Sequence, residues 1–146
     1  MIAVTASTTV SAPPERVWEL MCDTDRYAEW VVGTDAVTRA DGPAREGVRY
    51  EEDNTILGPW KAHTTWLVRE FESPRRQLHA SDDVPLCKRF EVVMEVEPEA
   101  EISLVTLTLR ADPALGPVGS AFARLMKRQV ARDNRKTATQ LAQLCR

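Results

Sequence analysis

The chain has 146 residues, of which 43% are hydrophobic and 28% charged, proportions that indicate a globular protein and exclude a fibrous or disordered one. A formal net charge of −3 is too small to indicate a class of partner. The cysteines Cys22, Cys87 and Cys145 have no metal-ligand spacing, and their odd number favours free thiols in a reducing cytoplasm. We therefore expect one domain over residues 1–146.

No segment approaches the roughly 20 apolar residues that a membrane-spanning helix needs. The first residues also lack the basic and apolar regions of a signal peptide. These features predict a cytoplasmic protein without membrane insertion.

The first predicted strand covers residues 3–10 and ends where Pro13 and Pro14 follow Ser11 and Ala12. Proline is favoured in the first turn of a helix, so a short helix is expected from residue 14 to residue 22. A second short helix is expected up to residue 30, and Gly33 ends it.

After residue 33 the apolar pattern changes from helical to alternating spacing. Six further strands are predicted, at residues 36–40, 48–54, 60–71, 77–81, 86–96 and 102–111. Short turns rich in proline, glycine and aspartate separate them. Such short connections require antiparallel neighbours, because a parallel crossover needs a dozen or more residues.

One long helix is predicted from residue 117 to residue 144. It is the only predicted element large enough to cover the apolar face of a seven-stranded sheet. The predicted fold class is therefore α+β, a curved antiparallel sheet around a long C-terminal helix, with two short helices between strands 1 and 2.

Residues 124–136 of that helix include six basic residues and a single acidic one, Asp133. We expect a solvated helix face, and the alternative is a surface for acidic lipid or nucleic acid. The acidic remainder of the chain and the lack of a nucleic-acid motif argue against nucleic acid.

Several motifs resemble a known superfamily. They are Ser-Ala-Pro-x-x-x-Val-Trp-x-Leu at residues 11–20, Asp-x-x-Arg-x-x-x-Trp at 23–30, the turn at 68–76, and Leu-Gly-Pro at 115–117. The chain resembles the START-like helix-grip superfamily (SRPBCC), which includes the birch pollen allergen and the bacterial polyketide cyclase/dehydrase family. The resemblance implies a cavity between sheet and helix, and it does not imply a particular reaction.

Strand parity predicts which side chains face inward. Tyr50, Glu52 and Asn54 share one face of their strand, so a carboxyl group points toward the interior. An unpaired buried carboxylate is costly. Glu52 is therefore either a rim residue or a ligand-facing, catalytic acid.

The other predicted lining residues are mostly apolar or aromatic, and Thr64 adds a polar group. They are Trp60, Thr64, Trp66, Phe90, Met94, Phe122 and Met126. Such walls are typical of a small-molecule pocket and equally of a filled core. The family resemblance favours the cavity.

Parity places His63 on the outside, unless a β-bulge shifts the register by one residue. His63 is the stronger functional candidate because it lies between two tryptophans in the longest strand, whereas His79 is expected to be exposed.

The sequence has no phosphate-binding glycine loop, nucleophile elbow or zinc-type histidine pair, so no cofactor and no metal are expected. The favoured hypothesis is binding of a small hydrophobic or aromatic, polyketide- or lipid-like molecule, by a monomer or a homodimer. The alternative, which the resemblance suggests, is a polyketide cyclase/dehydratase. In it Glu52 would be the acid/base, Tyr50 or His63 its partner, and Asn54 would orient a carbonyl.

Overall fold

The computed structural model describes residues 1–145 of the chain. The elements, in chain order, are β1 (Ile2–Val10), α1 (Pro14–Cys22), the 3-10 helix η1 (Thr24–Arg26), α2 (Tyr27–Trp30), β2 (Thr34–Ala40), β3 (Arg49–Leu57), β4 (Trp60–Glu72), β5 (Arg76–Ser81), β6 (Cys87–Glu99), β7 (Ile102–Pro113) and α3 (Gly116–Leu144).

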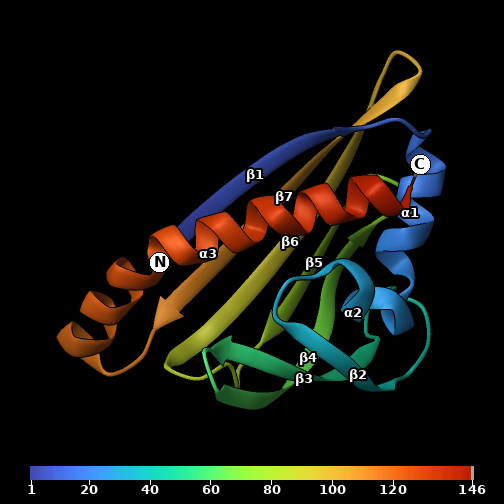
Figure 1. The fold of residues 1–146 in the computed structure, drawn as a ribbon. Coiled ribbons are helices and arrows are strands. Elements are labelled where there is room, and N and C mark those ends of the chain that lie inside the picture. Colours follow the sequence, from blue (N-terminus) through green and yellow to red (C-terminus); the bar gives the residue numbers. More distant parts are fainter. Residues whose placement is uncertain (146) are drawn as a thin grey trace.

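Within these residues, seven strands form one antiparallel sheet in the order β1-β7-β6-β5-β4-β3-β2. The sheet curves strongly, and α3 lies along its concave side (Figure 1). This arrangement confirms the predicted helix-grip fold, including the two short helices between the first two strands.

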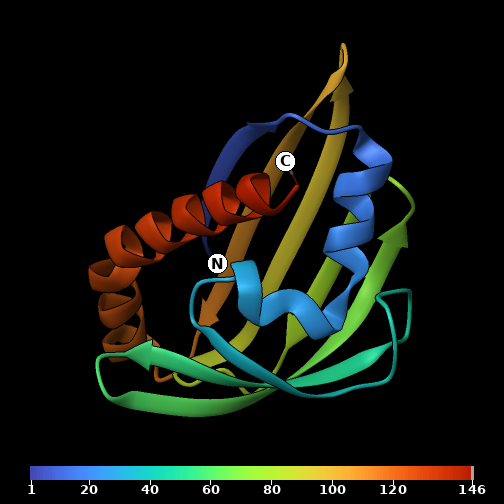
Figure 2. The same cartoon turned by 45° about the vertical axis from the view of Figure 1, so that its right-hand side comes forward.

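The short helices close one end of the concave side. In α1, Pro14 occupies the first turn, and the apolar side chains Val17, Leu20 and Met21 are buried at helical spacing. Tyr27 and Trp30 of α2 are both about 1% exposed. Figure 2 shows α1 across the sheet from α3, whereas α2 lies beside α3 and contacts it.

The long helix begins at a tight turn that depends on glycine. Leu115 and Gly116 both have a positive φ, near 64° and 55°. A Cβ on Gly119 would lie 1.5 Å from the Ala114 carbonyl oxygen, so only glycine permits this close approach. The helix then runs 29 residues, about 43 Å at 1.5 Å per residue. Its main contacts in the sheet are β1 and β7.

Because α3 packs over only one side of the curved sheet, space remains between it and the strands on the other side. The buried residues Val10, Val17, Val96, Val105 and Leu141 belong to the core that fills the rest of the interior. The fold therefore positions a hollow between β3, β4, β6, β7 and the C-terminal half of α3.

Candidate functional site

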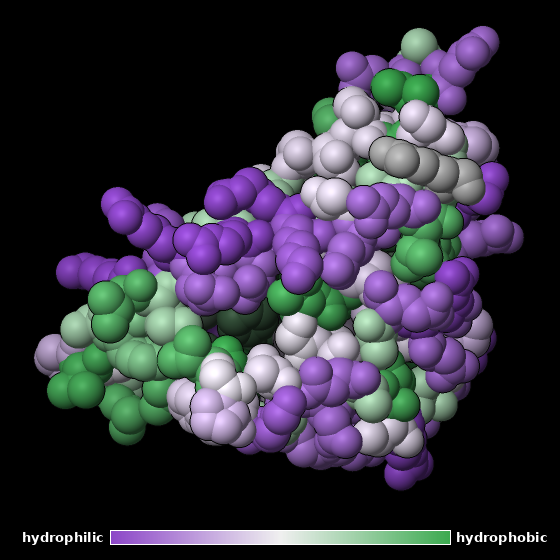
Figure 3. Space-filling view, in the orientation of Figure 1, coloured by the Kyte–Doolittle hydropathy of each residue, from purple (hydrophilic) through white to green (hydrophobic). Residues whose placement is uncertain are grey.

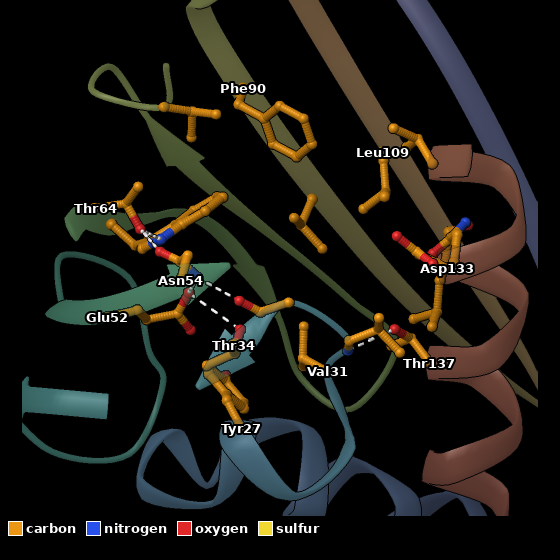
Figure 4. A pocket seen from close by; sticks show the side chains of 18 of the residues that line it. Tyr27, Val31, Thr34, Glu52, Asn54, Thr64, Phe90, Leu109, Asp133 and Thr137 are labelled. Carbon is orange, nitrogen blue, oxygen red and sulfur yellow. Dashed lines mark hydrogen bonds between the residues drawn. The ribbon is translucent and has the colours of Figure 1, made fainter. Parts of the chain in front are cut away.

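A cavity of about 240 Å³ lies in this hollow. The volume is just below the roughly 300–1,000 Å³ of pockets for drug-sized molecules, which favours a compact ligand. Its walls are mostly apolar, and they come mainly from α2, the loop before β2, β3, β4, β6, β7 and α3. Figure 4 shows Glu52 and Asp133 on opposite walls, with Phe90 and Leu109 between them.

Glu52 is the buried carboxyl group of the cavity. Its residue is 5% exposed, and burial raises the pKa of the carboxyl from 4.5 to about 7, although hydrogen bonds from Asn54 and Thr34 act in the opposite direction. Near neutral pH the group is therefore populated both as acid and as carboxylate. A pKa close to the working pH is the property that a general acid/base needs.

A chain of hydrogen bonds along the cavity wall connects Trp66 to the carboxyl of Glu52. Trp66 Nε1 donates to Thr64 Oγ1 at 2.8 Å, and that hydroxyl donates to Asn54 Oδ1 at 2.5 Å. Asn54 Nδ2 in turn donates to Glu52 Oε1 at 3.1 Å, which also accepts from Thr34 Oγ1 at 3.3 Å. Residues 1–145 provide no hydrogen bond to Glu52 Oε2, so this oxygen is available to a ligand or a proton.

This network depends on the register of two strands. Glu52 pairs with Thr64 and Asn54 pairs with Ala62 across β3 and β4, so that their inward side chains are neighbours. Asn54 also donates to the Gly33 carbonyl at 3.3 Å, which ties the loop before β2 to the site. The positive φ of Gly33, near 93°, permits the turn in that loop.

The C-terminal half of α3 supplies the opposite wall through Val130, Asp133, Asn134 and Thr137. Asn134 is buried and donates to the Leu107 carbonyl at 2.9 Å, and Thr137 Oγ1 accepts from the Val32 amide at 2.9 Å. These bonds fasten the helix to β7 and to the loop before β2. None of these four residues was among the predicted lining residues.

Two features of the lining bear on the ligand. Trp30 lines the cavity and is buried, and within residues 1–145 its indole Nε1 has no hydrogen-bond partner. Among the described lining residues there are two carboxyl groups, on Glu52 and Asp133, and no lysine, arginine or histidine. The cavity therefore offers no cationic partner to an anionic ligand.

The prediction that His79 is exposed is wrong. The residue is completely buried, its Nδ1 lies 2.6 Å from Tyr50 Oη, and its Nε2 lies 2.7 Å from Gln77 Oε1. The amide oxygen can only accept, so Nε2 carries the proton and Nδ1 accepts from the tyrosine hydroxyl. Val68 of β4 pairs with His79, and both side chains are buried on the inner face of the sheet. Burial lowers the pKa of His79 from 6.5 to about 3.

Tyr50 was considered as a partner of Glu52, and its hydroxyl instead binds His79. Its ring lines the cavity and lies 6.3 Å from that of Trp66, in a stacked arrangement. Burial raises the pKa of Tyr50 well above its usual value. Tyr50 thus contributes an aromatic wall rather than an acidic hydroxyl.

The structure places His63, the other catalytic candidate, on the outer face of the sheet, away from the cavity. Its ring nitrogens lie 2.9 Å from Asp53 Oδ1 and 2.8 Å from Glu51 Oε1. The hydrogen bond to Asp53 and then that to Glu51 raise the pKa of His63. This group is an exposed charge cluster and does not approach Glu52.

Of the other expected lining residues, Asn54, Thr64, Trp66, Phe90 and Met94 do line the cavity. Trp60 shares the inward parity of β4, but it lies at the tip of the β3–β4 hairpin, beyond the cavity, and is 38% exposed. Phe122 and Met126 lie on the half of α3 that precedes the cavity wall, and they are only partly buried. Parity and helical spacing specified the face but not the position along each element.

Within residues 1–145, no group of three or more His, Cys, Asp or Glu side chains is arranged to hold a metal ion. No helix in the described part of the chain is both long and apolar enough to cross a membrane.

The sequence matches a family model described as "Polyketide cyclase / dehydrase and lipid transport" over residues 1–146. Among curated proteins, no sequence matches the chain significantly.

Solved structures share the fold at low sequence identity. TTHA0849 from Thermus thermophilus has a TM-score of 0.81 and 19% identity, with 99% of this chain and 97% of that chain covered. The Zhui aromatase/cyclase from Streptomyces sp. R1128 has a TM-score of 0.78 and 20% identity, with 99% and 93% covered. Ara h 8.0201 has a TM-score of 0.67 and 8% identity, with 97% and 98% covered. At such identities the likeness shows the fold alone.

Proposed function

Because the chain belongs to the polyketide cyclase/dehydrase and lipid transport family, we propose that it binds a compact, uncharged, largely apolar molecule in the cavity beside Glu52. The observation that carries this proposal is the mostly apolar lining together with the connected group of polar side chains on the β3–β4 wall. Apolar walls provide affinity, and a few placed polar groups provide orientation.

The charges of the lining residues favour an uncharged ligand. An anionic ligand would bring a second negative charge close to Glu52 and Asp133, with no cation on the described walls to offset it. A neutral carbonyl or hydroxyl compound avoids this repulsion. Its oxygen atom could accept the unpaired indole N–H of Trp30 or bind the protonated form of Glu52.

Calorimetric titration with two bicyclic probes of similar shape tests this proposal. At pH 8, where Glu52 is mostly ionised, neutral 2-acetylnaphthalene is expected to bind at least tenfold more tightly than the anion 2-naphthoate. In Glu52→Gln the difference is expected to narrow. Equal affinity of the two probes, or no binding of either, contradicts the proposal.

A pair of variants on β6 locates the binding site. Val92→Trp fills the cavity and is expected to abolish binding of 2-acetylnaphthalene. Lys88→Trp introduces the same side chain at an exposed position of the same strand and is expected to leave the affinity unchanged. The opposite pattern would place the ligand outside the cavity.

A second candidate function is cyclisation of a poly-β-ketone. The observation that favours it is the burial of Glu52 in the cavity, which raises the pKa of its carboxyl to about 7. The carboxylate would remove a proton from a methylene group between two carbonyls, and the enolate carbon would attack a further carbonyl. The protonated Glu52 would then return its proton to the new alkoxide. Subsequent loss of this hydroxyl with a neighbouring proton, as water, would give the dehydrated ring.

Turnover assays with a poly-β-ketone distinguish catalysis from binding. Loss of an acid/base group costs typically 10²–10⁴-fold, so Glu52→Gln is expected to lower kcat by that factor, and the wild-type rate should rise through pH 7. Glu51→Gln, its neighbour on the outer face, is the matched control. If Glu52→Gln binds the substrate and turns it over at the wild-type rate, Glu52 has no catalytic role.

A further inference from the structure

The N-terminal half of α3 and the residue before it, Leu115, expose large apolar side chains. Leu115, Val118 and Leu125 are 65%, 74% and 78% exposed. Figure 3 shows this apolar surface at the end of the helix, beside hydrophilic side chains along α3 and a hollow below it. Isolated apolar residues on a surface are ordinary, but a group of large ones on one element indicates a contact site.

Exposed basic side chains continue the same helix face. The spacing of Val118, Leu125, Arg128, Arg132 and Lys136 by seven, three, four and four residues places them along one side of α3, and all five are exposed. Residues 124–136 contain six basic residues against Asp133, in a chain whose net charge is −3. We call Leu115, Val118, Leu125, Arg128 and Arg132 the docking face.

We propose that the docking face binds the surface of an anionic lipid bilayer, with its apolar side chains in the interface and its arginines at the headgroups. An amphipathic helix with cations beside large apolar residues is the standard structure for such binding. The face is a single convex helix, which suits a deformable, laterally extended surface better than it suits a preformed groove.

Charge and symmetry argue against other occupants. In a two-fold dimer with antiparallel helices, the arginines of one copy would lie over the apolar side chains of the other and would be desolvated without an opposite charge. Nucleic acid would make no use of Val118 and Leu125, and the remainder of the chain is acidic.

The docking face adjoins the cavity. Leu125 is five residues, about 7.5 Å along the axis, from Val130, which lines the cavity. Figure 3 shows the hollow between α3 and the strands on the side that the docking face borders. Binding to a bilayer would therefore hold the cavity near the membrane, from which a membrane-dissolved apolar molecule could enter. The bilayer contact itself does not depend on the ligand proposed above.

Vesicle flotation without any cavity ligand tests the proposal. The wild-type protein is expected to float with vesicles of 70% phosphatidylcholine and 30% phosphatidylglycerol, and at least fivefold less with phosphatidylcholine alone or in 0.5 M NaCl. Leu125→Glu and the double variant Arg128→Gln, Arg132→Gln are each expected to reduce the bound fraction at least fivefold. All three substitutions are at exposed positions, and the melting temperature of each variant serves to confirm folding.

The matched control for charge is the double variant Arg49→Gln, Arg69→Gln, which removes two exposed cations from β3 and β4. It is expected to bind vesicles as the wild type does. Equal binding to neutral and anionic vesicles, or unchanged binding of Leu125→Glu, would overturn the proposal. So would a dimer in sedimentation velocity that Leu125→Glu dissociates, because a second copy would then cover this face.

Discussion

Asn54 Nδ2 donates a hydrogen bond to Glu52 Oε1 over 3.1 Å, between two residues of β3 whose side chains share the inner face of the sheet. The same amide accepts from Thr64, so its orientation is determined by the neighbouring strand. The buried carboxyl therefore has a fixed donor on Oε1, whereas residues 1–145 provide no hydrogen bond to Oε2. This relationship underlies both the binding and the catalytic proposals.

Asn54→Ala is expected to raise the pKa of Glu52 further, because the hydrogen bond from Asn54 favours the carboxylate. Thr34→Val removes the second donor and is expected to cause a smaller rise. The measurement is an NMR titration of the ¹³C-labelled Glu52 carboxyl. A fall in its pKa in Asn54→Ala would show that the amide does not stabilise the charged form.

The dependence of stability on pH is expected to reveal two opposing groups. Glu52 has a folded-state pKa of about 7, above its ordinary value of 4.5, so it contributes stability below pH 4.5 that is lost as pH rises through 7. His79 has a folded-state pKa of about 3, below 6.5, so its contribution is present above pH 6.5 and is lost as pH falls toward 3. Between pH 4.5 and 6.5 the two slopes have opposite signs.

In Glu52→Gln, His79 is the one of these two groups that still contributes to the pH dependence of stability. The free energy of unfolding, from urea titrations at pH 5, 6, 7 and 8, is then expected to rise with pH more steeply than in the wild type. At pH 8 the variant is expected to be more stable by about 3 kcal/mol, as an order of magnitude. Parallel curves for the two proteins would contradict the pKa assigned to Glu52.

The two histidines are expected to differ sharply in their effect on stability. His79→Leu leaves the hydroxyl of Tyr50 and the amide oxygen of Gln77 buried without their partner, at a cost of about 1–3 kcal/mol for each such group. His63→Leu changes an exposed cluster of charges, so the free energy of unfolding is expected to change by no more than about 0.5 kcal/mol in either direction. Chemical denaturation of both variants is the measurement, and similar losses would contradict the burial of His79.

Gly119→Ala is expected to destabilise the start of α3 by roughly 1–3 kcal/mol, because the new methyl group would overlap the Ala114 carbonyl. Ser120→Ala, one residue further along the same helix, is the control and should have little effect. Thermal unfolding of the two variants tests this. A stabilised Gly119→Ala would show that the turn at Leu115 can move away from the helix.

The sequence pattern predicted the strands, the short helices and the inward face of β3, because alternation and helical spacing directly reflect burial. Glu52 and Asn54 were placed correctly on the inner face for this reason. His79 was predicted to be exposed because it shares its parity with the polar residues Gln77 and Ser81, whereas both faces of that strand are buried. Periodicity cannot identify the inner face of such a strand.

The sequence pattern also did not indicate which part of a helix or strand lies beside the cavity. Phe122 and Val130 share one helical face, yet only Val130 reaches the cavity, because the first turns of α3 extend past the sheet (Figure 1). The helical spacing of apolar residues does not indicate where the sheet under the helix ends. The contribution of Thr34 depends similarly on the loop at Gly33, whose path follows from tertiary contacts.

The central claim is that a compact neutral molecule binds inside the cavity, and an NMR titration with 2-acetylnaphthalene tests it most directly. In ¹⁵N-labelled protein the indole signals of Trp66 and Trp30 and the side-chain amide of Asn54 are expected to shift, since all three residues line the cavity. The indole of Trp60, on the exposed hairpin, is expected to stay unchanged. Shifts confined to Trp60, or no shifts at saturating probe, would contradict the claim.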